Sequence, residues 1–444
     1  MPDSFANHRF VEAVRATDLL DRRGVVTRIM PTYIEADGPG VPVGSLCALM
    51  EGDGFILAEV VKVEIGRVTL MPYANPVSLC VGSTVIAQSW GGSVMMGEAY
   101  LGRVVDPLGQ PLDGGKQIHA YHPRSLSGVP VSPLDRAMAK QPVQTGIRAI
   151  DGLLTIGVGQ RVGIFAGSGV GKTTLMTSLT RNIEADCCVL CLVGERGREA
   201  EDFWHGALSD DTRSKATMVV ATSDQPAVMR ARAVLFALTL AEYLREQGKH
   251  VLLLLDSVTR FAMALREIGL AAGEPPTVRA YTPGVFSMLP KIVERCGSIK
   301  AGGSITAFMT VLTENDDADD PLAETMKSLL DGHIVLSREL AEQGHFPAIH
   351  VPRSVSRLFR QVTDPQAQAL ATDAVAQLSL YESSRTLVES GLYAAGSNPA
   401  LDRALLLRDR LVNFLRQPEL QLNSPPLSRN DTLKALSQLL MAGG

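Results

Sequence analysis

The sequence contains no apolar run long enough to span a membrane, although 45% of its 444 residues are hydrophobic. Its first residues, MPDSFANHRFVEAVRA, carry acidic side chains and lack the apolar core of a secretory signal. Basic residues are not in excess, because 42 Lys and Arg face 47 Asp and Glu, for a net charge of −5. We therefore expect a cytosolic protein whose main partner is not nucleic acid.

Cysteine is also scarce, and its placement argues against a zinc or redox site. Cys188 and Cys191 form a CxxC motif, but both lie inside an apolar run, and no second Cys/His pair follows at zinc-site spacing. We interpret them as buried free thiols. The six cysteines are Cys47, Cys80, Cys187, Cys188, Cys191 and Cys296.

The first third of the chain changes pattern twice. Residues 1–21 have an amphipathic pattern that predicts a short N-terminal helix. Residues 22–92 contain short β-rich runs split by Gly and Pro, which predict a small antiparallel β-barrel domain. Residues 101–140 are turn-rich, and we interpret them as a linker.

Apolar strand-like runs then alternate with helical patterns, which is typical of a mostly parallel sheet covered by helices. We assign residues 93–364 to this α/β domain and residues 365–444 to a C-terminal helical domain. The expected strands cover 161–166, 188–193, 218–223, 251–256, 304–312 and 333–337, and the expected helices include 172–184 and 226–247.

The first strand of the α/β region runs directly into AGSGVGKTTL, residues 166–175. This is a P-loop pattern, in which glycines let successive backbone N–H groups point at phosphate oxygens. In such a loop the lysine reaches the β- and γ-phosphates and the next hydroxyl ligates Mg²⁺. The residues expected to bind the nucleotide are Gly167, Ser168, Gly169, Val170, Gly171, Lys172, Thr173 and Thr174.

Carboxylates end two other strands of the same predicted sheet. Asp256 follows four leucines, and with Thr173 we expect it to hold Mg²⁺. Glu195 follows CCVLCLVG at the edge where ligands bind in such sheets, so it can polarise an attacking water. Glu199, one helical turn later, can orient a water on the metal. The alternative for Glu195 is a structural ion pair with Arg196 or Arg198.

These motifs, together with LLLLDSVTRFAMALREI and PAIHVPRSVS (347–356), resemble the ATP synthase α/β superfamily. Within it, FSMLPKIVERCG and DGHIVLSRELAEQGHFPAIH look most like the type III export ATPases. The resemblance covers residues 22–415. It implies a RecA-like P-loop core between the barrel and the helical domain, and ATP with Mg²⁺ as substrate and cofactor.

The resemblance also implies a homohexameric ring with ATP between neighbouring subunits. Arg357, in the matching SxSR segment, would complete the neighbour's site. Arg196 and Arg260 align with arginines near the nucleotide, and Phe346 with an aromatic ring that stacks on adenine, although core packing is the alternative for Phe346. His350 stands where these ATPases usually have Asp.

Further partners follow from the same resemblance. A stator-like regulator would bind the N-terminal helix at the cytoplasmic face of the inner membrane. A coiled-coil stalk would enter the ring pore beside the 275–290 loop and TENDDADDP (313–321), which is otherwise a solvated acidic loop. The export gate membrane proteins and chaperone–substrate complexes would be the remaining partners.

Among functions, we expect ATP hydrolysis that powers flagellar protein export, with the virulence injectisome as the close alternative. A rotary ATP synthase catalytic subunit is a further alternative, but the sequence between DSVTRF and the SxSR segment resembles the export ATPases more. A Rho-type RNA translocase would need aromatic residues and basic stripes on the barrel, which has few of either. A non-catalytic subunit would lack the carboxylate at Glu195.

Overall fold

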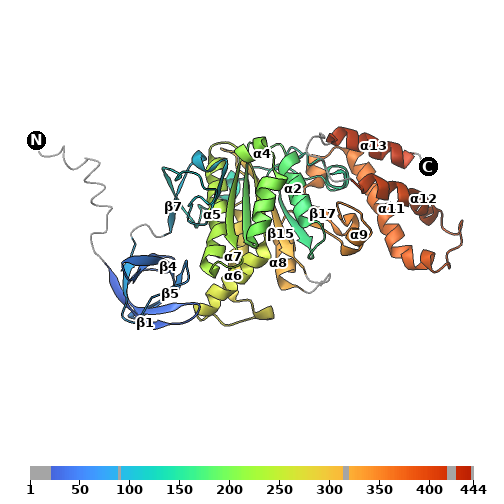
Figure 1. Ribbon diagram of the computed structural model, residues 1–444. Helices are drawn as coiled ribbons and strands as arrows, with labels where there is room; N and C mark the ends of the chain where they lie inside the picture. The colour runs from blue at the N-terminus through green and yellow to red at the C-terminus, as the bar shows by residue number, and fades with distance from the viewer. Residues whose placement is uncertain (1–21, 89–91, 314–319, 418–426, 442–444) are drawn as a thin grey trace, which may run out of the picture.

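The N-terminal part of the described chain is a closed antiparallel barrel. The computed structural model describes residues 22–88, 92–313, 320–417 and 427–441, so the predicted helix over 1–21 lies outside the described residues. The strands join in the order β1-β2-β5-β4-β3-β6 (Figure 1). Inward side chains such as Val26, Leu49 and Leu70 fill the interior. The barrel strands are β1 Arg23–Ile29, β2 Ile34–Asp37, β3 Leu46–Glu51, β4 Gly54–Glu64, β5 Arg67–Pro72 and β6 Thr84–Ala87.

A mostly parallel nine-stranded sheet forms the centre of the molecule, with the order β17-β16-β10-β15-β13-β11-β12-β8 and β14 beside β15. All six predicted strands are confirmed. Its strands are β8 Arg103–Val105, β10 Arg161–Ala166, β11 Cys187–Glu195, β12 Ala216–Thr222, β13 His250–Asp256, β14 Gly297–Ser298, β15 Ser304–Leu312, β16 Gly332–Val335 and β17 Val355–Ser356.

The linker interpretation of residues 101–140 is wrong in two places. Strand β8 pairs in parallel with β12 and extends the central sheet at its edge. Strands β7 (Ser93–Met96) and β9 (His122–Ser125) form a separate antiparallel pair. Three- and four-residue strands separated by turns are too short to show a periodicity in the sequence.

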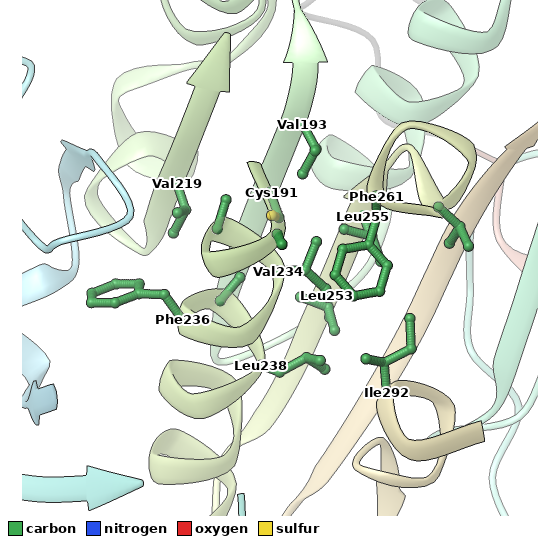
Figure 2. Close-up of a cluster of buried hydrophobic side chains, with 14 of the residues drawn as sticks. Cys191, Val193, Val219, Val234, Phe236, Leu238, Leu253, Leu255, Phe261 and Ile292 are labelled. Carbon is green, nitrogen blue, oxygen red and sulfur yellow. The ribbon is translucent and has the colours of Figure 1, made fainter. Parts of the chain in front are cut away.

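Helices cover both faces of the sheet. On one face α5, α6 and α7 pack over alternate side chains of β11 such as Cys191 and Val193, with Phe236 and Phe261 among them (Figure 2). The other face carries α2 and the C-terminal helices. The helices are α2 Lys172–Asn182, α3 Gly197–Glu201, α4 Asp210–Ser214, α5 Ala227–Glu246, α6 Val258–Ala271, α7 Pro283–Glu294, α8 Pro321–Leu329, α9 Arg338–Glu342, α10 Phe359–Val362, α11 Pro365–Glu389, α12 Pro399–Leu415 and α13 Arg429–Met441.

One segment expected to be a loop contains a helix. The predicted 275–290 loop becomes α7 at Pro283, a residue that suits the first helical turn. The predicted C-terminal helical domain ends with α13, which packs Leu436 and Leu440 into the same core as α12. Of the acidic stretch 313–321, residues 314–319 lie outside the described part, and Asp320 caps α8. In the described chain, no helix is both long and apolar enough to cross a bilayer.

Cys188 and Cys191 are confirmed as buried free thiols, and the other cysteines are also free and, except for Cys80, buried. Cys188 and Cys191 point to opposite faces of the sheet, because an odd spacing along a strand reverses the side chain. The two sulfurs of the CxxC motif therefore cannot share a metal ion. Burial raises the pKa of the Cys187 and Cys296 thiols to about 12.

A buried ion pair joins α5 to Arg295, the residue directly after α7. Arg295 donates to both oxygens of Glu242, at 2.9 and 2.6 Å, and both side chains are 8% exposed. Arg295 also donates to the Leu126 carbonyl and to the Thr239 hydroxyl, each at 2.8 Å. All charged groups of the pair are therefore satisfied away from water, as such a pair requires.

Breaking this pair should cost far more stability than breaking its exposed counterpart on the same helix. Glu242→Gln leaves the Arg295 charge buried without a full partner, so we expect a loss of about 3 kcal/mol of unfolding free energy. Glu246→Gln removes a surface ion pair in which the Arg124 side chain is 33% exposed and the Glu246 side chain 39%. This change should cost at most about 1 kcal/mol of unfolding free energy. Urea denaturation measures both, and equal losses would contradict the buried role.

Candidate functional site

The loop between β10 and α2 has the backbone of a phosphate-binding loop. Gly169 and Gly171 have φ angles of 76° and 87°, in the left-handed region that favours glycine. Gly171 caps α2, so the free N–H groups of the first helical turn open toward the loop. Thr173 and Thr174 in this turn are exposed, while Val170 is buried beneath the loop. The strand–loop–helix context predicted from the sequence is confirmed.

Lys172 bridges two carboxylates at the carboxyl ends of β11 and β13. Its ammonium nitrogen lies 2.6 Å from Asp256 Oδ1 and 3.3 Å from Glu195 Oε1. The three side chains are only 14%, 6% and 8% exposed. Because β11 and β13 are neighbours in the sheet, their ends place both acids beside the P-loop. The structure thus brings together the three residues on which the sequence prediction depends.

Glu195 has a second cationic partner, Arg260, and the sequence did not predict this ion pair. Arg260 Nη1 lies 2.8 Å from Glu195 Oε2, and the same guanidinium donates to the Gly194 carbonyl. A Cβ at Gly194, where φ is 67°, would lie 2.9 Å from Arg260 Cδ, so glycine is needed for this approach. No local spacing marks the contact, because α6 brings Arg260 from 65 positions away.

The proposed alternative pairing of Glu195 is therefore wrong. Arg198 lies 3.4 Å from Asp202 on the exposed side of α3. Arg196 is exposed at the start of α3, directly after Glu195. Burial and a hydrogen bond shared with Glu199 raise the pKa of Glu195, while Lys172 and Arg260 lower it, and the net shift is upward. A carboxylate with a raised pKa holds a proton more strongly, which suits a general base.

Asp256 is oriented by a hydroxyl that sequence reasoning missed. Thr310, on β15, donates to Asp256 Oδ1 at 2.6 Å. Its only signal is a hydroxyl within the apolar run SITAFMTVL. The oxygens of Asp256 and Thr173 are the hard donors that Mg²⁺ prefers, so these residues fit the metal. The described residues contain no group of three His, Cys, Asp or Glu side chains placed to hold a metal ion, so Mg²⁺ here would take its other ligands from phosphate oxygens and waters.

A cavity of about 490 Å³ opens beside the P-loop. Phe346 lines it and is 40% exposed, which contradicts core packing as its role. Its ring lies 3.4 Å from the position of a Cβ on Gly171. The Gln417 backbone donates to the Phe346 carbonyl at 2.8 Å, and its side chain accepts from Arg148 N at 2.7 Å, which fixes the wall of the cavity. The cavity suits a flat aromatic ligand.

Arg357 is the one predicted site residue that the structure places elsewhere. It follows β17 at the amino end of the sheet, where its backbone N donates to the Asp331 carbonyl at 2.9 Å. The P-loop lies at the opposite end of β10, about 17 Å away along the strand at about 3.3 Å per residue. Arg357 is exposed, and it does not approach the P-loop of its own chain.

His350 makes a contact of its own. Its Nε2 lies 2.8 Å from Glu382 Oε1 on α11, and its Nδ1 accepts from Arg353 N at 3.3 Å. The histidine thus ties the segment after Phe346 to the C-terminal helices.

Comparison with known proteins agrees with this geometry. The ATP synthase α/β family, nucleotide-binding domain, matches residues 146–356, and the C-terminal domain of the type III secretion ATPase EscN matches 363–438. The flagellum-specific ATP synthase of Bacillus subtilis is 42% identical over 97% of this chain and 98% of its own. The SPI-2 type 3 secretion system ATPase of Salmonella typhimurium is 45% identical over 91% and 93%.

Solved structures give the same result for the fold. The assembled ATPase EscN of the enteropathogenic E. coli type III secretion system is 41% identical, with a TM-score of 0.89, and the match covers 94% of this chain and 100% of that one. The barrel, the P-loop sheet and the C-terminal helices are therefore shared along almost the whole chain. With its P-loop, its paired carboxylates and these relatives, the chain belongs to the type III export ATPase family of the ATP synthase α/β superfamily.

Proposed function

We propose that this P-loop ATPase powers flagellar protein export, releasing chaperones and unfolding substrates at the export gate. The observation that carries its catalytic part is the bridge from Lys172 to Glu195 and Asp256 beside an open cavity. Relatives named as flagellum-specific occur in several bacteria, which favours the flagellar system. The injectisome remains the second candidate because the SPI-2 relative is as similar.

Complementation separates the two systems. The chain should restore swimming to a Salmonella strain that lacks its flagellum-specific ATP synthase, as measured in soft agar. Restored SPI-2 secretion without swimming would favour the injectisome. Failure in both strains, with the protein present at normal amounts, would contradict export.

In the proposed reaction the nucleotide competes with two carboxylates for Lys172. The backbone of residues 167–174 takes the phosphates, and Phe346 stacks on adenine. Lys172 turns to the β- and γ-phosphates, which frees Asp256, with Thr173 and a water oriented by Glu199, to hold Mg²⁺. When bound, this ion neutralises phosphate charge. Glu195 then accepts the proton of the attacking water.

Two arginines surround this base in the proposal. Arg260 keeps Glu195 aimed at the cleft, and its bond to the Gly194 carbonyl fixes the guanidinium. Arg196, exposed at the start of α3, lies next in the chain to Glu195 and is free to turn toward the phosphates.

We also propose a homohexamer in which Arg357 reaches the nucleotide of the neighbouring subunit. Its distance from its own P-loop supports this, because one chain cannot complete the site. EscN has been solved assembled and in complex with its central stalk EscO. We propose a similar coiled-coil stalk, a stator-like regulator at residues 1–21, and a position at the cytoplasmic face of the inner membrane, with no nucleic acid partner. The domain division at residues 22, 93 and 365 stays a prediction.

Glu195→Gln tests the base. The amide retains the size of the side chain but cannot take a proton, so we expect unchanged ATP binding and a loss of at least about 100-fold in kcat. Fluorescent-nucleotide titration and steady-state hydrolysis measure the two quantities. A turnover near that of wild type would mean that Glu195 only anchors Lys172 and Arg260.

Arg357→Ala tests the shared site. We expect the specific activity of wild type to rise with protein concentration, and that of the variant to stay at least about 1,000-fold lower at every concentration. Arg360→Ala, which removes another exposed arginine three positions later, should behave as wild type. Activity that is independent of concentration, with Arg357→Ala unaffected, would show that each subunit holds a complete site.

A further inference from the structure

We infer that Asp331, clamped by Arg161, positions Arg357 for catalysis. This inference rests on the proposed role of Arg357 in a shared active site. It adds residues that lie away from the P-loop of their own chain, since they lie at the amino end of β10, whereas the P-loop lies at its carboxyl end.

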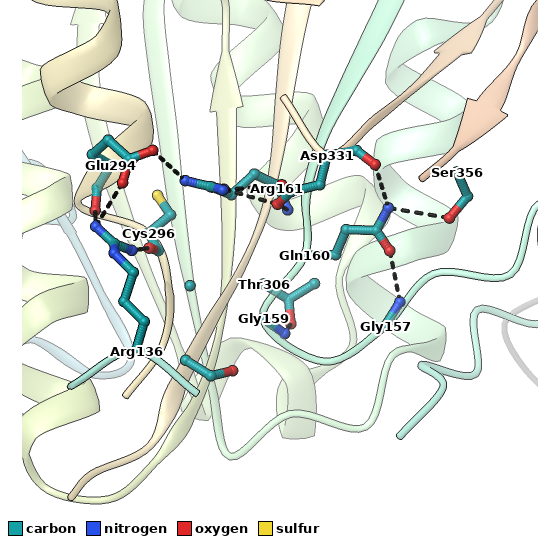
Figure 3. A network of polar contacts seen from close by, with 12 residues as sticks. Arg136, Gly157, Gly159, Gln160, Arg161, Glu294, Cys296, Thr306, Asp331 and Ser356 are labelled. Atoms are coloured by element: carbon teal, nitrogen blue, oxygen red, sulfur yellow. Dashed lines mark hydrogen bonds and ion pairs between the residues drawn. The ribbon is translucent and has the colours of Figure 1, made fainter. Parts of the chain in front are cut away.

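Asp331 binds two parts of the chain through different atoms. Its carboxylate takes a fork from Arg161, with Nε to Oδ2 at 2.8 Å and Nη2 to Oδ1 at 2.9 Å, and Oδ2 also accepts from the Arg161 backbone at 3.1 Å (Figure 3). Its backbone carbonyl accepts from Arg357 N at 2.9 Å. The side chain therefore fixes the residue to β10, while the main chain fixes the arginine.

A buried glutamine reinforces the same segment. Gln160 is completely buried, and its Nε2 donates to the Asp331 carbonyl at 3.0 Å and to Ser356 Oγ at 3.1 Å. Ser356 Oγ in turn donates to the Thr155 carbonyl at 2.8 Å. The residue directly before Arg357 is thus bonded through its side chain as well as through the β16–β17 pairing.

The guanidinium of Arg357 is held near the same residue. Its Nη2 donates to the Lys327 carbonyl at 3.1 Å, in the last turn of α8. That helix ends at Leu329, two positions before Asp331. The Arg357 backbone is therefore held by Asp331 itself, and its guanidinium is held by the end of α8, whose position depends on Asp331.

The geometry of the clamp matters more than its charge. A two-bond fork between arginine and carboxylate fixes orientation as well as distance. The Arg161 and Asp331 side chains are 18% and 23% exposed, so water competes little for the bonds. Glu294 of α7 also binds Arg161, at 2.7 Å, but it is 56% exposed and makes no bond to the Arg357 segment. It offers a matched control on the same arginine.

Asp331→Asn weakens the fork and keeps the backbone carbonyl that holds Arg357. Because an error of about 1 Å in a catalytic group can cost on the order of 100-fold, we expect kcat to fall at least about tenfold, with KM for ATP unchanged. In an Arg357→Lys background, which retains charge and some turnover, the same change should cost less than about twofold. Steady-state kinetics at saturating protein concentration measure all four proteins.

Glu294→Gln should cost less than about twofold in both backgrounds. Arg161→Lys, which retains the charge and loses the fork, replaces Asp331→Asn if thermal melting shows that the latter does not fold. Equal losses in the two backgrounds, or no loss in the wild-type background, overturn the inference. If Arg357→Lys itself turns over as fast as wild type, the proposed role of Arg357 fails first, and the inference fails with it.

Discussion

The ammonium group of Lys172 neutralises two carboxylates that the sheet places side by side in a poorly hydrated cleft. Glu195 and Asp256 are each less than a tenth exposed, and like charges at such close range repel strongly. Without Lys172, Arg260 beside Glu195 would be left to offset both negative charges. The lysine is thus as necessary to the resting sheet as it is to the proposed reaction, because it permits two acids at adjacent strand ends.

The sheet also separates the two halves of the chemistry. Parallel strands align their carboxyl ends, so the P-loop, Glu195 and Asp256 gather at one edge. The SxSR segment forms β17, which pairs with the start of β16. Arg357 therefore lies at the amino ends of the parallel strands, opposite the P-loop. No side-chain motion spans the length of β10. For Arg357 to reach a nucleotide, the amino end of one sheet would have to face the carboxyl end of the sheet in another copy, which is the physical basis for proposing a ring.

The sequence was sufficient wherever the signal was local. Four leucines before Asp256, the glycines around Lys172 and the apolar run before Glu195 predicted both the strands and the acids at their ends. Contacts across the sheet could not be predicted, since nothing in their spacing brings Arg260 to Glu195 or Thr310 to Asp256. Strand β8 failed for a different reason, because its three residues gain their structure from pairing with β12 rather than from their own pattern. The helix α7 was missed because Pro283 was interpreted as part of a loop, although proline suits a first turn.

The position of Lys172 sets a physical condition on nucleotide binding. Any triphosphate that recruits this ammonium must offer at least as much negative charge as the two carboxylates that it leaves. The backbone N–H groups at the start of α2 add to the attraction of the loop for the phosphates. A divalent ion compensates the negative charge of the carboxylates that Lys172 leaves. Arg260 remains on Glu195 throughout, so the base does not lose all of its positive neighbours when Lys172 turns away. The cleft can therefore exchange its internal ion pairs for phosphate contacts without burying an uncompensated charge. Because the exchange involves all four charged groups, Lys172, Glu195, Asp256 and Arg260 act as one electrostatic unit.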